Sequence, residues 1–115
     1  MIKRQSAYET KINENMRGGD GSVKIENLLT PDEMNNKGRL YAKITLELGC
    51  SIGFHVHEGE MESYHIVSGV AQYDDNGKTV TLQAGDTTHT PASEGHGIKN
   101  AGDEPLVLIA LILFV

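Results

Sequence analysis

The chain has little of what several protein classes require. Among its 115 residues there is no tryptophan, and there are only two phenylalanines and one cysteine, Cys50. A single cysteine cannot form a disulfide within the chain, so a reducing compartment is permitted. The scarcity of large aromatic side chains, together with 13 glycines, favours short strands and turns over helical packing. The length corresponds to one domain.

Basic residues are also few. The 10 Lys and Arg against 16 Asp and Glu give a net charge of −6, so no basic surface for phosphates is expected and nucleic acid is excluded as a partner. The first residues, "MIKRQSAYETK", lack the apolar run of a signal peptide. The final "LVLIALILFV" is too short for a membrane helix, which needs about 20 residues. We therefore expect a cytoplasmic protein without a membrane partner.

The N-terminal part of the chain is polar. Residues 1–22 end in the glycine-rich "RGGDGS" and are interpreted as an N-terminal arm, followed by one domain over residues 23–115. The "TPDE" sequence that begins at Thr30 predicts one short helical turn. Thr30 would cap it, Pro31 would occupy its first position and Glu33 would complete a capping box.

From Leu40 to Leu48 apolar and polar residues alternate, which is typical of a half-buried strand. Further strands are expected at 52–57, 62–68, 70–74, 78–83, 87–90, 96–99 and 106–114. Turn sequences separate them, among them the Asn-Gly of "DDNGK", a strong hairpin signal. The pattern predicts an all-β, antiparallel sandwich or barrel. The last strand does not alternate, so both of its faces should be buried.

The stretch "FHVHEGEMESYHIVSG", residues 54–69, contains three of the five histidines. Residues two apart on a strand face the same side, so His55 and His57 point together, and Glu62 can meet them from the next strand. Two imidazoles and a carboxylate suit a borderline divalent ion. The alternative is a solvated polar edge of a hairpin, and the short motif alone leaves both interpretations open.

Two longer patterns resemble the motifs of the cupin family. The first motif has a glycine, H-x-H, a glutamate and a glycine at spacings matched by Gly49, His55, His57, Glu62 and Gly69. The second motif is matched by Gly85, Pro91, His96 and Asn100, with Ser93 where the family has a glycine. The resemblance extends from about Leu40 to the C-terminus.

The resemblance implies a small antiparallel double-stranded β-helix, or jelly-roll barrel, with a metal near one mouth. It assigns His55, His57, Glu62 and His96 as the ligands of one divalent transition metal per chain. The donor set suits Mn, Fe, Ni, Co, Cu or Zn, and the identity of the metal is left open. Asn100 and the motif glycines would be structural.

Strand parity predicts the placement of other polar residues near the motifs. His65 is an odd number of residues from Glu62, so it should face away from the ligands. The alternation does not decide whether His89 lines the pocket or is structural. Glu58 and Glu60 are expected to stay solvated in the turn.

Three more residues lie close to the first motif. Tyr64 shares the face of Glu62 and is the candidate catalytic residue, as a contact to substrate or to a ligand; the alternative is packing alone. Cys50 should face away from the ligands as a small buried hydrophobe. The thioether of Met61 is a poor ligand for a hard divalent ion.

Two functions are compatible with these features. The first is a metalloenzyme, dioxygenase-like or decarboxylase- or isomerase-like, that acts on a small polar metabolite at open metal positions. The second is a non-catalytic binding or sensing module for a small molecule. Family resemblance favours the enzyme, and the absence of a clear second base favours oxygenase-like chemistry over isomerisation.

A homodimer is also expected. The terminal run Leu106 to Val115 is apolar on both faces, and a barrel interior covers only one of them. A large bare apolar patch is unusual on a monomer, and similar small cupins commonly pair back to back.

Overall fold

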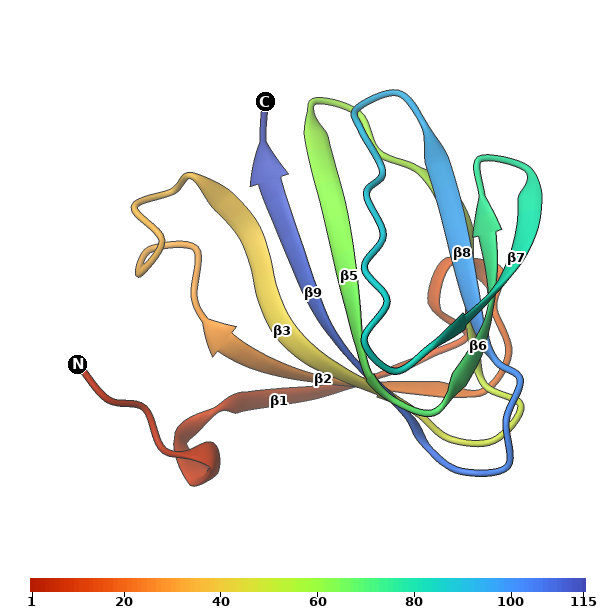
Figure 1. Cartoon of the computed structure of the whole chain (residues 1–115). Coiled ribbons are helices and arrows are strands. Elements are labelled where there is room, and N and C mark those ends of the chain that lie inside the picture. The colour runs from red at the N-terminus through yellow and green to blue at the C-terminus, as the bar shows by residue number, and fades with distance from the viewer.

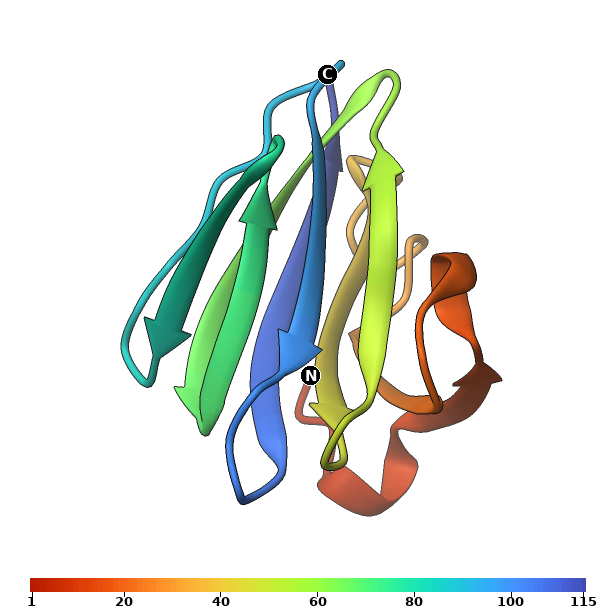
Figure 2. The same cartoon turned by 90° about the vertical axis from the view of Figure 1, so that its right-hand side faces the viewer.

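The computed structural model covers residues 1–115 and shows two antiparallel sheets that face one another (Figure 1). The five-stranded sheet has the order β1 (Glu9–Glu14), β2 (Ser22–Leu29), β3 (Gly38–Leu46), β9 (Leu106–Phe114), β5 (Glu60–Ser68). The four-stranded sheet has the order β4 (Ser51–Val56), β8 (Gly95–Asn100), β6 (Val70–Asp75), β7 (Lys78–Gln83) and lies in front in Figure 2. Two short 3-10 helices, η1 (Gln5–Ala7) and η2 (Met16–Gly18), flank β1.

The predicted all-β double-stranded β-helix is confirmed, but the two sheets do not close into a barrel. The segment predicted as a strand at 87–90 is the reason. It forms only isolated bridges to β5, at Glu62–Thr90 and His65–Thr87, and does not continue into the four-stranded sheet. At the other side, β1 is an edge strand with no further partner.

The core lies between the sheets and follows the alternation read from the sequence. On β3, Ala42, Ile44 and Leu46 are buried. A fully buried Ile or Leu side chain contributes roughly 1.5–3 kcal/mol. On β9 every second residue, Leu106, Leu108, Ala110 and Ile112, is buried in the same core. Leu48 lies beyond the end of β3 and is 56% exposed.

The segment predicted as an arm contains the edge strand β1. This strand pairs with β2 along its length, from Glu9 opposite Asn27 to Glu14 opposite Ser22. Neither strand was predicted. The sequence "ETKINE" of β1 has one apolar residue, Ile12, and that residue is 54% exposed, so the strand has no hydrophobic pattern to read.

The predicted turn at Thr30 has the expected capping box. The Thr30 N–H donates to the Glu33 carboxylate (2.8 Å), and the Glu33 N–H donates to Thr30 Oγ1 (3.2 Å). Hydrogen-bonded turns follow without forming a helix, because Asn35 and Asn36 adopt left-handed conformations with φ of 55°. None of the helical segments of the structure reaches the length and apolarity of a membrane span.

Candidate metal centre

Four side chains from three strands converge between the sheets, and they are the four that the cupin motifs assign. His55 comes from β4, His57 directly follows β4, Glu62 comes from β5 and His96 from β8. One ligand atom of each lies within 4.8 Å of the others. Glu62, His57 and His96 are buried and His55 is half-buried. The alternative of a solvated hairpin edge is therefore wrong for these side chains.

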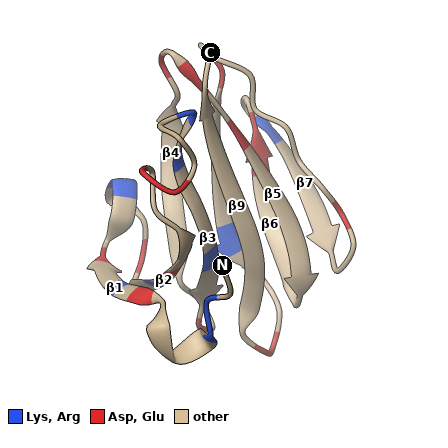
Figure 3. Ribbon diagram, turned by 90° about the vertical axis from the view of Figure 1, so that its left-hand side faces the viewer, with Lys and Arg blue, Asp and Glu red and all other residues tan.

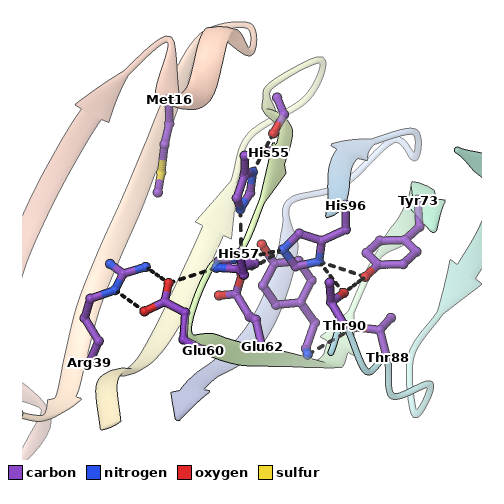
Figure 4. A network of polar contacts seen from close by, with 12 residues as sticks. Met16, Arg39, His55, His57, Glu60, Glu62, Tyr73, Thr88, Thr90 and His96 are labelled. Carbon is purple, nitrogen blue, oxygen red and sulfur yellow. Dashed lines mark hydrogen bonds and ion pairs between the residues drawn. The ribbon is translucent and has the colours of Figure 1, made fainter. Parts of the chain in front are cut away.

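The orientation of each imidazole is set by a partner on its other nitrogen (Figure 4). The Nδ1–H of His55 donates to the Gly53 carbonyl oxygen (2.8 Å), and Nδ1 of His57 lies 2.9 Å from Glu60 Oε1. Nδ1 of His96 lies 2.8 Å from the Tyr73 hydroxyl and 3.0 Å from Thr90 Oγ1. With Nδ1 occupied in each ring, Nε2 is left to face the centre, as metal-binding histidines require.

The spacing of the donors fits a metal ion. Bonds of about 2.1 Å at right angles place neighbouring donors about 3 Å apart. Nε2 of His57 and Nε2 of His96 each lie 2.8 Å from Glu62 Oε1 and 3.2 Å from one another. Nε2 of His55 is 3.8 Å from the same oxygen. Buried lone pairs that point at one another repel, so this arrangement needs either protons or a cation at its centre.

The charges of the centre are strongly coupled. Burial alone would raise the pKa of Glu62, but hydrogen bonds from the three imidazoles hold it well below its ordinary value. The Glu62 carboxylate raises the pKa of His57 against the opposing effect of burial. Burial lowers the pKa of His96. Glu62 is therefore held as an anion, and His96 favours the neutral form that a metal would require.

Glu60 was expected to be solvated, and that expectation is wrong. Its side chain is only 12% exposed and accepts two hydrogen bonds from Arg39, at 2.9 Å from Nε and 2.7 Å from Nη2. The Arg39 guanidinium lowers the pKa of Glu60 to about 2, and His57 adds to the effect. An Arg39–Glu60–His57 chain thus orients His57. No sequence signal pointed to it, because Arg39 and Glu60 are on different strands, each paired with β9.

Tyr64 faces inward, as predicted from its parity with Glu62. It is 1% exposed and stacks on the His96 ring, with centroids 4.8 Å apart and planes at 19°. Burial raises the pKa of Tyr64 well above its ordinary value, and the negative charge of Glu62 adds to the effect, so Tyr64 is a neutral phenol. An interaction of its hydroxyl with the Glu62 carboxylate contributes to this rise, and Tyr64 lines the pocket described below.

The other histidines lie outside the centre. His65 is exposed, as predicted, with Nδ1 2.8 Å from Thr87 Oγ1. His89 is also exposed, between the buried Thr88 and Thr90, and it does not line the pocket of the metal centre.

Two further residues singled out in the sequence are Cys50, beside the first motif, and Ser93, in the second. Cys50 is a free, half-buried thiol that packs against the core, less buried than predicted. Ser93, which replaces a family glycine, adopts the left-handed conformation that glycine favours, with φ of 75°. Its N–H donates to the His57 carbonyl oxygen (2.7 Å), so the glycine-like turn is kept and holds the backbone of a candidate ligand.

A pocket of about 300 Å³ opens from the centre toward β1 and η2. The candidate ligands His55, His57 and Glu62 form part of its wall. In Figure 4, Met16 extends from η2 toward the same space and Arg39 approaches from β3. A small molecule in the pocket could therefore contact an ion held by the four side chains.

Comparison with known proteins gives consistent matches. The cupin domain family matches residues 42–112. An oxalate-binding protein of Thermotoga maritima is 42% identical over 115 residues, which is 100% of this chain and 95% of that protein. The oxalate decarboxylase OxdC of Bacillus subtilis is 35% identical over 75 residues, 61% of this chain and 20% of that protein.

A solved structure agrees with the fold over its full length. The crystal structure of a predicted oxalate decarboxylase from Thermotoga maritima has a TM-score of 0.96 at 42% identity and covers 100% of both chains. The match of the family over residues 42–112 includes all four converging side chains. On this evidence, the chain belongs to the cupin family.

Proposed function

We propose that this cupin binds one divalent transition metal through His55, His57, Glu62 and His96 and uses it to bind a small carboxylate of the oxalate class. The observation that carries the proposal is the convergence of four oriented donors at the inner end of a pocket. A bound ion would supply a Lewis acid for a carboxylate oxygen. The name of the oxalate-binding relative from Thermotoga maritima supports this ligand class.

The protein's own residues would do the rest of the binding. Tyr64 is a buried neutral phenol beside Glu62 that lines the pocket, so its hydroxyl is placed to donate a hydrogen bond to a ligand oxygen there. Hydrogen bonds to a charged group are worth about 1.5–3 kcal/mol. The chain Arg39–Glu60–His57 and the Tyr73–His96 contact hold the imidazoles in place before any ligand enters.

The test is calorimetric titration of oxalate into metal-loaded and metal-free protein. We expect binding only to the loaded form, and weaker binding by about tenfold or more in Tyr64→Phe. Equal binding of oxalate with and without metal would contradict the proposal. The matched control is Tyr41→Phe on β3, whose side chain is outside the pocket lining.

Catalysis is a second candidate, and the neutral phenol of Tyr64, beside Glu62 and in the pocket wall, is the observation that favours it. The same titrated samples would be assayed for oxygen uptake and for carbon dioxide and formate. Oxygen uptake would support the oxygenase-like alternative, and carbon dioxide with formate the decarboxylase-like one. Tight binding with neither would identify a binding module.

We further infer a homodimer formed through the outer face of the five-stranded sheet. The outward residues of β9, Val107, Ile109, Leu111 and Leu113, remain half-buried, and Figure 3 shows β9 as an uncharged strip on this face. Nearby Val67 on β5 is 50% exposed. Light scattering of the wild type should give twice the mass of one chain. The variant Ile109→Asp should have the mass of a single chain. A monomeric wild type would contradict the inference.

A further inference from the structure

The pocket is larger than the metal centre and oxalate require. Its volume of about 300 Å³ lies at the lower end of the range for small-molecule pockets, about 300–1,000 Å³. It corresponds to the space of about ten water molecules at about 30 Å³ each. Oxalate is the smallest dicarboxylate and would fill only a small part of it.

Part of the pocket wall is aliphatic. Side chains from both sheets contribute, namely Ile25, Leu40, Ile44, Ile52 and Ile112. Such walls favour methylene groups and disfavour a second charge held close to the metal. A ligand that used the whole pocket would therefore have an apolar segment next to the group at the centre.

Two positive side chains line the mouth of the pocket without an ion-pair partner, and the acidic Glu9 also belongs to the lining. Lys11 of β1 and Arg17 of η2 both line the pocket, both are exposed, and neither has a carboxylate within 4.0 Å. Arg39 also lines the pocket, but its charge is paired with Glu60. Lys11 and Arg17 are therefore free to bind an anionic group of a ligand.

The backbone that carries Arg17 is held firmly against β4. A Cβ added at Gly53 would lie 2.1 Å from the Arg17 carbonyl oxygen, and one added at Gly19 would lie 2.3 Å from that of Ser51. The Asp20 N–H also donates to Ser51 Oγ (2.8 Å). Arg17 itself has a φ of 55°, a conformation that is uncommon for residues other than glycine and tends to occur at functional sites.

We propose that the ligand is a dicarboxylate longer than oxalate. One carboxylate binds at the metal centre beside Tyr64, the methylene groups contact the aliphatic walls, and the second carboxylate binds Arg17 and Lys11 at the mouth. This rests on the proposed function, because the metal centre anchors the first carboxylate. The N-terminal hairpin of β1, η2 and β2 then selects the length and charge of the ligand.

The experiment is a calorimetric series on the full chain loaded with Mn(II). The ligands are oxalate, malonate, succinate, glutarate and adipate, with propionate, butyrate, valerate and hexanoate as monocarboxylates of matching length that lack the second charge. At least one diacid longer than oxalate should bind at least tenfold more tightly than oxalate does. The same diacid should also bind at least tenfold more tightly than the monocarboxylate of its length. In the variant Lys11→Gln with Arg17→Gln that advantage should fall about tenfold, with oxalate affinity unchanged.

The matched control is Lys78→Gln, which removes a positive charge at the exposed β6–β7 hairpin, far from the pocket lining. It should bind every diacid like the wild type. If oxalate binds more tightly than all longer diacids, or if the double variant binds them like the wild type, the inference is overturned while the proposed function stands. If no carboxylate binds to the loaded protein, the proposed function fails, and this inference fails with it.

Discussion

The inner end and the mouth of the pocket are built in opposite ways. At the inner end, His55, His57 and His96 each have a partner on Nδ1. At the mouth, Lys11 and Arg17 have no carboxylate partner. Burial explains the difference, because a buried polar group without a partner costs free energy, whereas an exposed cation is solvated by water. The side chains at the inner end are thus oriented in advance and could hold a metal, while the mouth keeps its charges available.

The two ends also differ in how firmly the fold supports them. Glu62 is on β5, an edge strand with several buried residues, and His96 is on β8, which is paired on both sides, with β4 and β6. Lys11 is on β1, an edge strand with no buried residue. Strands with few buried contacts open more readily than strands packed into the core. Changes at the inner end should therefore affect metal binding, and changes at the mouth should affect the hairpin and leave the metal in place.

The largest expected effect is loss of the metal. His55→Ala combined with His57→Ala removes two of the four donors, so the metal content should fall from about one ion per chain to near zero. Elemental analysis after purification measures it, and circular dichroism checks that the sheets remain. His65→Ala, which removes an exposed histidine, is the control. A double variant with full metal content would show that the assigned ligands are wrong.

The next effect tests the partner of an inner ligand. Glu60→Gln keeps the shape of the side chain but removes the charge that faces His57 and Arg39. Loss of such a partner typically weakens metal affinity 10–100-fold, and competition with a chelating dye would measure it. Glu58→Gln changes an exposed glutamate of the same turn and should have no effect. If the two variants bind metal equally well, Glu60 does not position His57.

A smaller effect is expected at the mouth. In Gly19→Ala the new Cβ would lie 2.3 Å from the Ser51 carbonyl oxygen, so η2 must move away from β4. Overpacking typically costs about 1–3 kcal/mol, and an edge hairpin can shift, so the cost should lie in the lower part of this range. We therefore expect amide hydrogen exchange in β1 to accelerate roughly tenfold. Metal content should stay at the wild-type level. A loss of metal in this variant would show that the two ends are not independent.

The smallest effect concerns backbone strain beside the inner end. In Ser93 the left-handed conformation costs roughly 1–2 kcal/mol, and Ser93→Gly removes this cost. The glycine also increases the entropy of the unfolded chain, which opposes the gain by about 0.5–1 kcal/mol. The net gain in the free energy of unfolding should be about 0.5–1 kcal/mol, measured from urea denaturation. Ser93→Ala keeps the strain and should gain nothing. A destabilised glycine variant would mean that the Ser93 side chain contributes more than the structure shows.

Much of the inner end could be predicted from the sequence. Alternation with a period of two placed His55 and His57 on the same face of their strand. It also placed Tyr64 on the same face as Glu62, and His65 on the opposite face of that strand. These predictions hold because neighbouring residues on a strand must point to opposite sides. His89 could not be assigned in this way, because its segment forms only isolated bridges and no regular strand.

The mouth and the supporting contacts were decided by the tertiary structure alone. Strand β1 has no apolar pattern, and it exists because β2 supplies a hydrogen-bonding edge. Arg39 and Glu60 meet only because β3 and β5 pair with opposite edges of β9 at the same level, where Gly38 and Met61 both pair with Leu113. The sequence by itself determined which side chains face inward, since that depends on local geometry. Which of them meet depends on strand order, which no local pattern encodes.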